Sequence, residues 1–179
     1  MRQIIKIIIL IFSMKNLYSQ NLVEFNNSSD IKNWLIVNDD VMGGLSKSNF
    51  YYSNKHAIFE GEISLKNNGG FASVRGNIDK IDVSPVKKIN LVIQGDKKNY
   101  QLRIKKNKED YYSYIHNFKT TGKNEIISIE LSEFIPYFRG RRLNKDNFSH
   151  NQIEQISFLI GNKSEEKFKL KIKKVFISD

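Results

Sequence analysis

The chain has 179 residues, of which 40% are hydrophobic, and it carries a formal net charge of +10 and no cysteine. This length fits a single domain with a sizeable core. The lack of cysteine excludes disulfides, a thiol nucleophile, a Cys-ligated zinc site and the lipid attachment of a bacterial lipoprotein. The domain must therefore be held together by the burial of apolar side chains alone.

The first 19 residues predict a secretory signal peptide. Arg2 and Lys6 lead into a short apolar run, acids are absent, and Ser19 supplies a small residue before a cut. A bilayer span needs roughly 20 apolar residues, and this run is much shorter. Removing the segment takes away three cations and no acid, so the net charge falls from +10 to +7. We expect an exported protein, periplasmic or secreted, whose mature chain 20–179 is one domain without a transmembrane segment.

Seven later segments alternate apolar and polar residues with a period of two. In the clearest, 167–174, Phe168, Leu170 and Ile172 share one face and lysines occupy the other. Half-buried antiparallel strands produce this pattern, because one face contacts a core and the other contacts water. The segments are 56–65, 87–96, 99–106, 110–120, 124–131, 155–161 and 167–174.

Glycine- and asparagine-rich turns separate these segments, and no stretch sustains a helical period. Short strands at this spacing predict an all-β sandwich or barrel and argue against a βαβ fold. Only brief turns are expected outside the strands, one capped by Asp30 and one before Pro136. Nothing indicates a repeat, a linker or a second domain.

The stretch WLIVNDDVMGGLSK joins two adjacent carboxylates, Asp39 and Asp40, to the pair Gly43 and Gly44. Neighbouring side chains in a strand point to opposite faces, so both acids can serve one site only if the backbone turns there. Glycine permits such a turn. The favoured interpretation is a tight corner in which one aspartate binds backbone amides and the other faces solvent. A metal or ligand site, which for Ca²⁺ needs six to eight oxygens, and a catalytic role remain as alternatives.

No motif assigns a catalytic residue, a metal ligand or a cofactor. The three histidines are isolated in sequence, and neither HExxH nor GxSxG occurs. The stretch VMGGLSK lacks the residue order of a phosphate-binding loop. His116 shares a face with Tyr112, Tyr114 and Phe118, which favours a hydrogen-bonded histidine in a sheet.

The arginines are the better candidates for contact with a partner. The stretch PYFRGRRL places three of them beside two aromatic residues, and two more lie on expected strands. Arginine makes planar, two-pronged contacts with carboxylates or phosphates. One arginine is expected to pair with Asp39 or Asp40 and the others to face a partner. The candidates are Arg75, Arg103, Arg139, Arg141 and Arg142.

Two further interpretations concern the basic residues. Basic and aromatic residues together are typical of proteins that bind single-stranded nucleic acid, but export argues against that partner. The lysine row of 167–174 is interpreted as protection of an edge strand against aggregation.

In order along the chain, NDDVMGGLS, FEGEISLKNNGGFASVR, GDKKNYQLRIK, PYFRGRRL, ISFLIGNK and FKLKIKKV resemble the complex I intermediate-associated protein 30 family, from about Phe25 to Ile177. The resemblance implies a galactose-binding-domain-like jelly-roll β-sandwich without agreed catalytic residues. It also implies a chaperone-like role, since mitochondrial members help to assemble respiratory complex I. Export would make complex I itself a doubtful partner. Gly43, Gly44, Gly69 and Gly70 are expected to shape a loop at the edge of the sandwich.

Three functions follow as hypotheses. The first is a non-enzymatic protein-interaction module that resembles an assembly factor. The second is a carbohydrate-binding module that uses Tyr51, Tyr52, Tyr111 and Tyr112, which requires an exposed, planar pair of rings in one groove. The third is a hydrolase of unrecognised type that uses Asp39 or Asp40.

Overall fold

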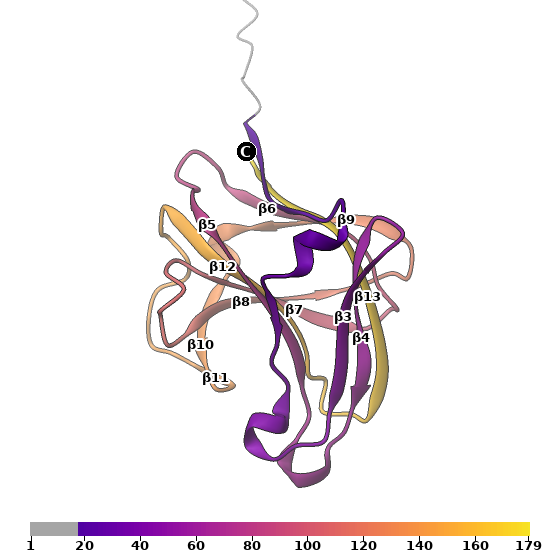
Figure 1. Cartoon of the computed structure of the whole chain (residues 1–179). Helices are drawn as coiled ribbons and strands as arrows, with labels where there is room; N and C mark the ends of the chain where they lie inside the picture. The colour runs from indigo at the N-terminus through magenta and orange to yellow at the C-terminus, as the bar shows by residue number, and fades with distance from the viewer. Residues whose placement is uncertain (1–17) are drawn as a thin grey trace, which may run out of the picture.

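The computed structural model of the chain describes residues 18–179, and it places two antiparallel sheets face to face (Figure 1). The regular structure of these residues consists of strands and short 3₁₀ turns, which agrees with the predicted all-β sandwich. Residues 1–17, most of the predicted signal peptide, lie outside the described part of the chain.

The first sheet has six strands in the order β3-β4-β13-β6-β9, and β1 pairs with β13 beside them. Its strand β13 pairs with β4 and β1 in succession along one edge and with β6 along the other. The strands are β1 (Ser19–Glu24), β3 (Lys47–Ser53), β4 (His56–Ile63), β6 (Lys88–Gln94), β9 (Asn124–Glu130) and β13 (Glu166–Ser178).

The second sheet has seven strands in the order β11-β10-β8-β7-β12-β5-β2. The β10–β11 hairpin therefore lies along one edge and β2 along the other, as the ribbon shows (Figure 1). The strands are β2 (Trp34–Ile36), β5 (Ala72–Asp82), β7 (Asn99–Lys105), β8 (Ser113–Lys119), β10 (Ile135–Phe138), β11 (Arg141–Arg142) and β12 (Gln152–Ile160). Four short turns connect them, η1 (Ser28–Ile31), η2 (Asp39–Met42), η3 (Lys66–Asn68) and η4 (Leu131–Glu133).

The period-two pattern correctly identified most core residues of the seven segments, but not buried residues outside them such as Phe25 and Phe134. On β7, Tyr100, Leu102 and Ile104 are buried between the sheets, and the intervening residues face outward. On β12, Phe158 is buried and stacks against Trp34 of β2. Burial of such side chains supplies the main driving force of folding, since cysteine is absent.

The sequence suggested that the lysine row protects an edge strand, but the row lies on a central strand. Strand β13 is central in the six-stranded sheet, and its Lys169 pairs with Glu60 of β4 at 2.7 Å. Alternation reports which face of a strand meets water, but it carries no information on whether both edges are paired.

The two predicted turns form with different details. Asn27 caps η1, and Asp30 instead accepts hydrogen bonds from the amides of Asn26 and Asn27, which completes a capping box. Pro136 follows η4 but lies within β10, paired with Tyr114. The alternation did not outline strand β5, on which Arg75 was expected, because Gly76 and Asn77 interrupt its apolar pattern.

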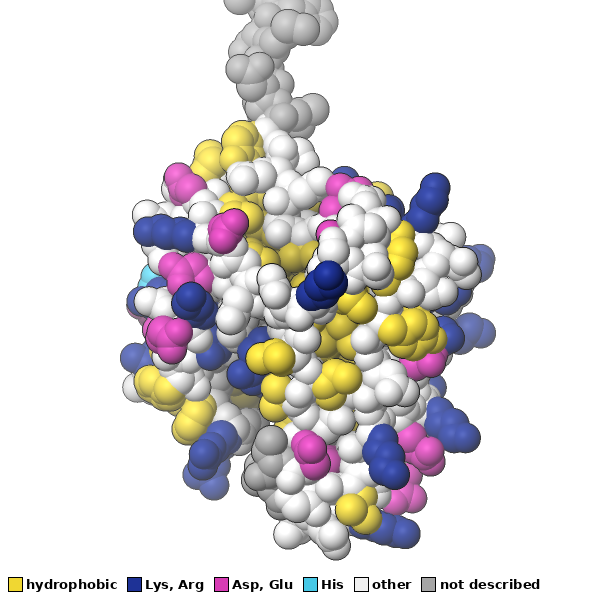
Figure 2. Space-filling view, viewed as in Figure 1, with side chains coloured by type: hydrophobic (Ala, Val, Ile, Leu, Met, Phe, Trp, Pro, Cys, Tyr) yellow, Lys and Arg dark blue, Asp and Glu magenta, His cyan; other side chains and the backbone are white. Residues whose placement is uncertain are grey.

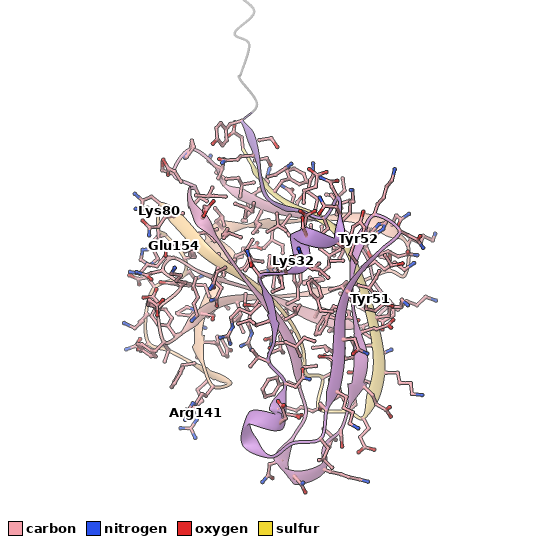
Figure 3. All side chains as sticks on the ribbon, viewed as in Figure 1. Lys32, Tyr51, Tyr52, Lys80, Arg141 and Glu154 are labelled. Atoms are coloured by element: carbon pink, nitrogen blue, oxygen red, sulfur yellow. The ribbon has the colours of Figure 1, made fainter. Side chains whose placement is uncertain are left out.

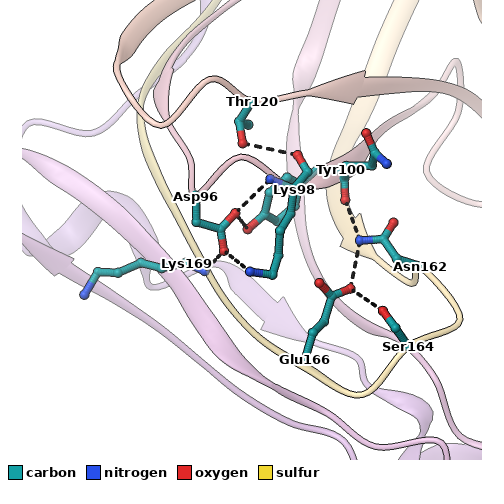
Figure 4. Close-up of polar contacts among 9 residues, drawn as sticks. Asp96, Lys98, Tyr100, Thr120, Asn162, Ser164, Glu166 and Lys169 are labelled. Atoms are coloured by element: carbon teal, nitrogen blue, oxygen red, sulfur yellow. Dashed lines mark hydrogen bonds and ion pairs between the residues drawn. The ribbon is translucent and has the colours of Figure 1, made fainter.

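A polar cluster anchors the buried Tyr100 at the turn between β6 and β7 (Figure 4). The Tyr100 hydroxyl donates to Asp96 at 2.9 Å, and the other carboxylate oxygen of Asp96 accepts from the Lys169 amide at 2.9 Å. Burial, together with the negative charge of Asp96, raises the pKa of Tyr100. Asp96 thereby connects β7 of one sheet with β13 of the other.

Replacement of Asp96 should therefore destabilise the fold. We expect Asp96→Ala to lower the free energy of unfolding by about 1–3 kcal/mol, because it leaves the buried Tyr100 hydroxyl without its acceptor. In Tyr100→Phe the hydroxyl is removed, and the loss should be about 0.5–1.5 kcal/mol. Urea unfolding of both variants and of the double variant measures this. Strict additivity in the double variant would contradict the contact.

Candidate functional site

Asp39 forms a buried corner between the two long connections of the sandwich. Its carboxylate accepts from the amide and hydroxyl of Ser46, from the Gly70 amide at 2.6 Å and from the Phe71 amide at 3.2 Å. The residue is only 1% exposed. These bonds join the connection after β2 to the one before β5, which is the corner that the sequence favoured.

The glycines of the two motifs make room for this carboxylate. A Cβ on Gly44 would lie 2.4 Å from Asp39 Cγ, and one on Gly69 would lie 2.7 Å from Asp39 Oδ2. Gly43 closes η2 in the left-handed conformation with φ +87°, which favours glycine. The glycine pairs and Asp39 thus form one structural unit.

The predicted pairing of an arginine with Asp39 is wrong. The partners of Asp39 are backbone amides and the Ser46 hydroxyl, which already supply the hydrogen bonds that the carboxylate needs. Burial raises the pKa of Asp39, but the bonds from Ser46, Gly70 and Phe71 outweigh it, so the pKa lies below its usual value. The neighbouring Asp40 is exposed.

Two of the candidate arginines lie together on the outer face of the seven-stranded sheet. Arg75 of β5 and Arg103 of β7 both pair with Ser157 of β12, so the three side chains point to the same side. One row of cross-strand neighbours runs through these three residues from edge to edge of the outer face, and we call it the central row. It consists of Leu35, Arg75, Ser157, Arg103, Ile115 and Ile135.

Arg103 is half-buried and held by a neutral partner. Its Nε and Nη2 donate to Gln101 Oε1 at 3.0 and 2.7 Å. Burial, with a contribution from the nearby charge of Arg75, lowers the pKa of Arg103 to about 10. Among residues 18–179, the ion pairs use lysine and histidine side chains, and none uses an arginine. The two guanidinium groups therefore share the face without a counter-charge.

The other three arginines lie on the β10–β11 hairpin, and all are exposed. Arg139 lies over the ring of Phe138 with its Cζ 5.3 Å from the ring centroid, and Phe138 contacts Tyr111 edge to face. Tyr111 is 62% exposed and Phe138 is 36% exposed. Tyr111, Phe138 and Arg139 form what we call the hairpin cluster. Figure 3 shows Arg141 projecting away from the sheet at the same hairpin.

The four candidate tyrosines do not form a planar pair. Tyr51 and Tyr52 lie on β3 of the other sheet (Figure 3), where they donate hydrogen bonds to Glu60 and to the Asn26 carbonyl. Tyr111 and Tyr112 are inclined to each other by 61°. The geometry that the tyrosine hypothesis required is therefore missing from these two pairs.

His116 makes one of the contacts expected of a histidine in a sheet. Its Nε2 lies 3.2 Å from Glu133, while its buried Nδ1 has no hydrogen-bond partner among the described residues. Across residues 18–179, no three His, Cys, Asp or Glu side chains converge in a way that would hold a metal ion. The same residues include no helix long and apolar enough to cross a membrane.

The family model of complex I intermediate-associated protein 30 (CIA30) matches residues 23–172, most of the chain. The chain therefore belongs to the CIA30 family, as its motifs suggested. No curated protein matches it.

Solved structures with this fold include carbohydrate-binding modules. The family 11 module of the cellulosomal cellulase Lic26A-Cel5E of Clostridium thermocellum matches with a TM-score of 0.64 and 14% identity, over 89% of this chain and 94% of that one. The Clostridium thermocellum family 11 module in complex with a β-1,3-1,4-mixed-linked tetrasaccharide matches with a TM-score of 0.63, 14% identity and the same coverage. The agarase AgWH50C matches with a TM-score of 0.58 and 14% identity, over 90% of this chain and 24% of that one. These likenesses establish the jelly-roll sandwich.

Sequence reasoning named the arginines but missed their companions. Alternation within 99–106 placed Arg103 outward, yet only the pairing of β5 and β7 with β12 places it beside Arg75. Leu35 and the contact of Tyr111 with Phe138 were also missed, because they depend on long-range pairing. No local signal identifies such neighbours.

If Asp39 is a structural corner, its replacement should cost stability. We expect Asp39→Asn to lower the free energy of unfolding by about 1–3 kcal/mol, since buried donors lose a charged acceptor. Asp79→Asn, at an exposed position on β5, is the control and should change stability by less than about 0.5 kcal/mol. An unchanged melting temperature for Asp39→Asn would contradict the corner role.

The same contact predicts a dependence on pH. Because the pKa of Asp39 is lower in the folded state, its contribution is complete above the unfolded pKa, near 4, and is lost as the pH falls through the folded pKa. The stability difference between the parent protein and Asp39→Asn should therefore be constant from pH 7 to about 5 and shrink below about 4. Chemical unfolding at a series of pH values tests this, and a difference that grows with acid would refute it.

Proposed function

We propose that this chain is a non-enzymatic binding module that contacts another protein, in the manner of an assembly factor. The observation that carries the proposal is the hairpin cluster, in which Tyr111 and Phe138 are exposed beside three arginines. Aromatic residues and arginine are enriched in protein interfaces and in their energetic hot spots. Membership of the CIA30 family supports the same class of function.

The backbone of the hairpin presents these side chains on a tight turn. Arg139 has φ +47° and Gly140 has φ +76°, which suits a two-residue connection between paired strands. Positive φ is uncommon for arginine, so the turn accepts some strain to place a guanidinium at its tip. The resulting Arg139–Phe138 contact keeps an apolar ring and a cation adjacent at the surface.

The geometry of the rings favours a protein over a neutral sugar as the ligand. Tyr111 and Phe138 meet at 82°, so they offer no continuous flat surface on which a sugar ring stacks. Such a cluster suits side chains that pack against the exposed parts of the two rings and pair with the arginines. On the side of the molecule drawn in Figure 2, hydrophobic side chains reach the surface between basic ones, a mixture common in protein interfaces.

Carbohydrate binding is the second candidate. Its support is the fold shared with modules such as the one solved with a mixed-linked tetrasaccharide. In this chain the central row of the outer face carries aliphatic and arginine side chains and Ser157, and Tyr137 of β10 is the aromatic residue beside it on the same face. A glycan would therefore depend on polar contacts with that face.

We propose further that the protein acts after export. The support is the charge pattern and short apolar run of the first 19 residues. Strand β1 begins at Ser19 and pairs with β13 as far as Glu24, so a cut after Ser19 leaves nearly all of this strand in the mature domain. Edman sequencing of the mature protein checks the cut.

The hairpin cluster should be needed to capture the partner. In-cell cross-linking of a C-terminally tagged copy, followed by mass spectrometry, should recover a small set of proteins. We expect a variant with Tyr111→Ala, Phe138→Ala and Arg139→Ala to lose at least about tenfold of that recovery, because each hot-spot truncation costs at least 1–2 kcal/mol.

A matched control tests the role of general charge and folding. The triple variant Lys47→Ala, Lys123→Ala and Lys167→Ala alters three exposed cations of the other sheet or its loops and should keep full recovery. Equal loss in both variants, or recovery of no protein by the parent chain, would overturn the proposal. Binding of the parent chain to mixed-linked β-glucan would then favour the carbohydrate alternative.

A further inference from the structure

We propose that the outer face binds an acidic, extended segment of the partner protein, with Arg75 and Arg103 receiving its carboxylates. This inference rests on the proposed protein-binding function and adds the chemistry of the bound segment. It uses the face of the sheet, whereas the hairpin cluster lies at the edge of the same sheet.

The spacing of the two arginines fits an extended ligand. They are separated by one strand, β12, so their Cα atoms lie about 10 Å apart at the usual spacing between strands. Ser157, between them, has a short side chain that leaves the space above it to the two guanidinium groups. A chain that crosses the strands would meet both groups in succession.

The charge balance of this face calls for an anion. A third cation, Lys105, lies on the same side of β7, and its ammonium donates to the carbonyls of Lys108 and Asp110. Burial, and after it the charge of Arg75, lowers the pKa of both Arg103 and Lys105, whereas Asp110 and Glu109 act in the opposite direction on Lys105 alone. Within residues 18–179, neither arginine takes part in an ion pair. A bound carboxylate would relieve this repulsion, and its contact with a half-buried guanidinium is stronger than one in bulk water.

Arg103 is already oriented to receive such a group. Gln101 holds its Nε and Nη2 on the outer face, and the other terminal nitrogen remains for a ligand. A side chain fixed in this way loses less conformational entropy when it binds, which favours affinity. Gln101 is neutral, so it orients the guanidinium without neutralising it.

The ends of the row favour a polypeptide over other anions. Leu35 is 61% exposed at one end, and at the other the half-buried Ile135 lies beside Ile115, which is 5% exposed. Apolar side chains that flank the acids of a peptide would contact these residues. A polyuronate or a nucleic acid would instead gain from a series of aromatic rings, for stacking, and this row contains none, with Tyr137 at its margin on β10.

Three probes distinguish the possible ligands. Poly-L-glutamate, polygalacturonate and a single-stranded oligodeoxynucleotide are each titrated against the purified domain, residues 20–179. Each titration is carried out at two salt concentrations. We expect poly-L-glutamate to bind and to shift the Nε–Hε signals of Arg75 and Arg103 in NMR spectra. Tighter binding of polygalacturonate or of the oligonucleotide, with the same signals shifted, would overturn the peptide assignment.

Charge-matched variants test the assigned residues. The pair Arg75→Gln and Arg103→Gln should weaken poly-L-glutamate binding by at least about tenfold, the equivalent of one charge-assisted hydrogen bond. The pair Lys123→Gln and Lys167→Gln removes the same charge elsewhere and should change the dissociation constant by less than about twofold. Equal weakening by both pairs would mean that net charge alone attracts the probe, and it would overturn the proposal.

The conservative pair Arg75→Lys and Arg103→Lys keeps the charge if the glutamine variants fail to fold. It should bind poly-L-glutamate more weakly than the parent, because lysine cannot make the two-pronged contact. Unchanged binding by this pair, with an intact circular dichroism spectrum, would overturn the role of the guanidinium groups.

The cross-linking experiment separates the two proposals. If the arginine variants keep the captured partner while the hairpin variant loses it, the acidic-segment inference fails and the protein-binding function stands. If both sets of variants keep it, the acidic-segment inference fails, and the protein-binding function loses the hairpin cluster as its site. Loss of the partner in both sets is the expected result.

Discussion

The burial of Tyr100, Leu102 and Ile104 between the two sheets determines which side chains of β7 reach the surface. Successive side chains of a strand point to opposite faces, so the neighbours of each buried residue face outward. Arg103 faces outward because Leu102 and Ile104 are buried, and the same rule on β5 directs Arg75 to that side. The charged face is thus a consequence of how the core is made.

The Asp39 corner fixes the position of the edge of the seven-stranded sheet, next to the strand that carries Arg75. Its bonds to Gly70 and Phe71 fix the chain just before β5, while η2 follows the short edge strand β2. Three paired residues and the bonds between Val37 and Ser73 hold β2 on β5, and the corner continues this attachment beyond the strand. The carboxylate of Asp39, which does not itself reach the surface, thus supports the edge that carries the exposed Leu35. A motif whose paired carboxylates left a catalytic role open contributes here to the shape of the proposed binding face.

The sequence predicted the sandwich and most of its core because period-two burial is a local property that each strand records by itself. It could not predict which strands are neighbours. The lysine row illustrates this limit, since β13 has the same alternation in the centre of a sheet as it would have at an edge. For the same reason Arg75 and Arg103 were named separately, and only their common partner Ser157 makes them one site.

The two surfaces on the seven-stranded sheet differ in what they contribute to recognition. The hairpin cluster exposes aromatic area, which supplies affinity wherever water is excluded. In the proposed complex the arginine pair would supply selectivity, because a partner without an acid would leave two half-buried charges unpaired. A partner segment that contacts both the hairpin cluster and the arginine pair must carry carboxylates and apolar side chains along one extended stretch. That requirement is narrower than general attraction to a basic protein, and it distinguishes this face from the solvated lysines of β13, where Lys169 already has Glu60 as its partner.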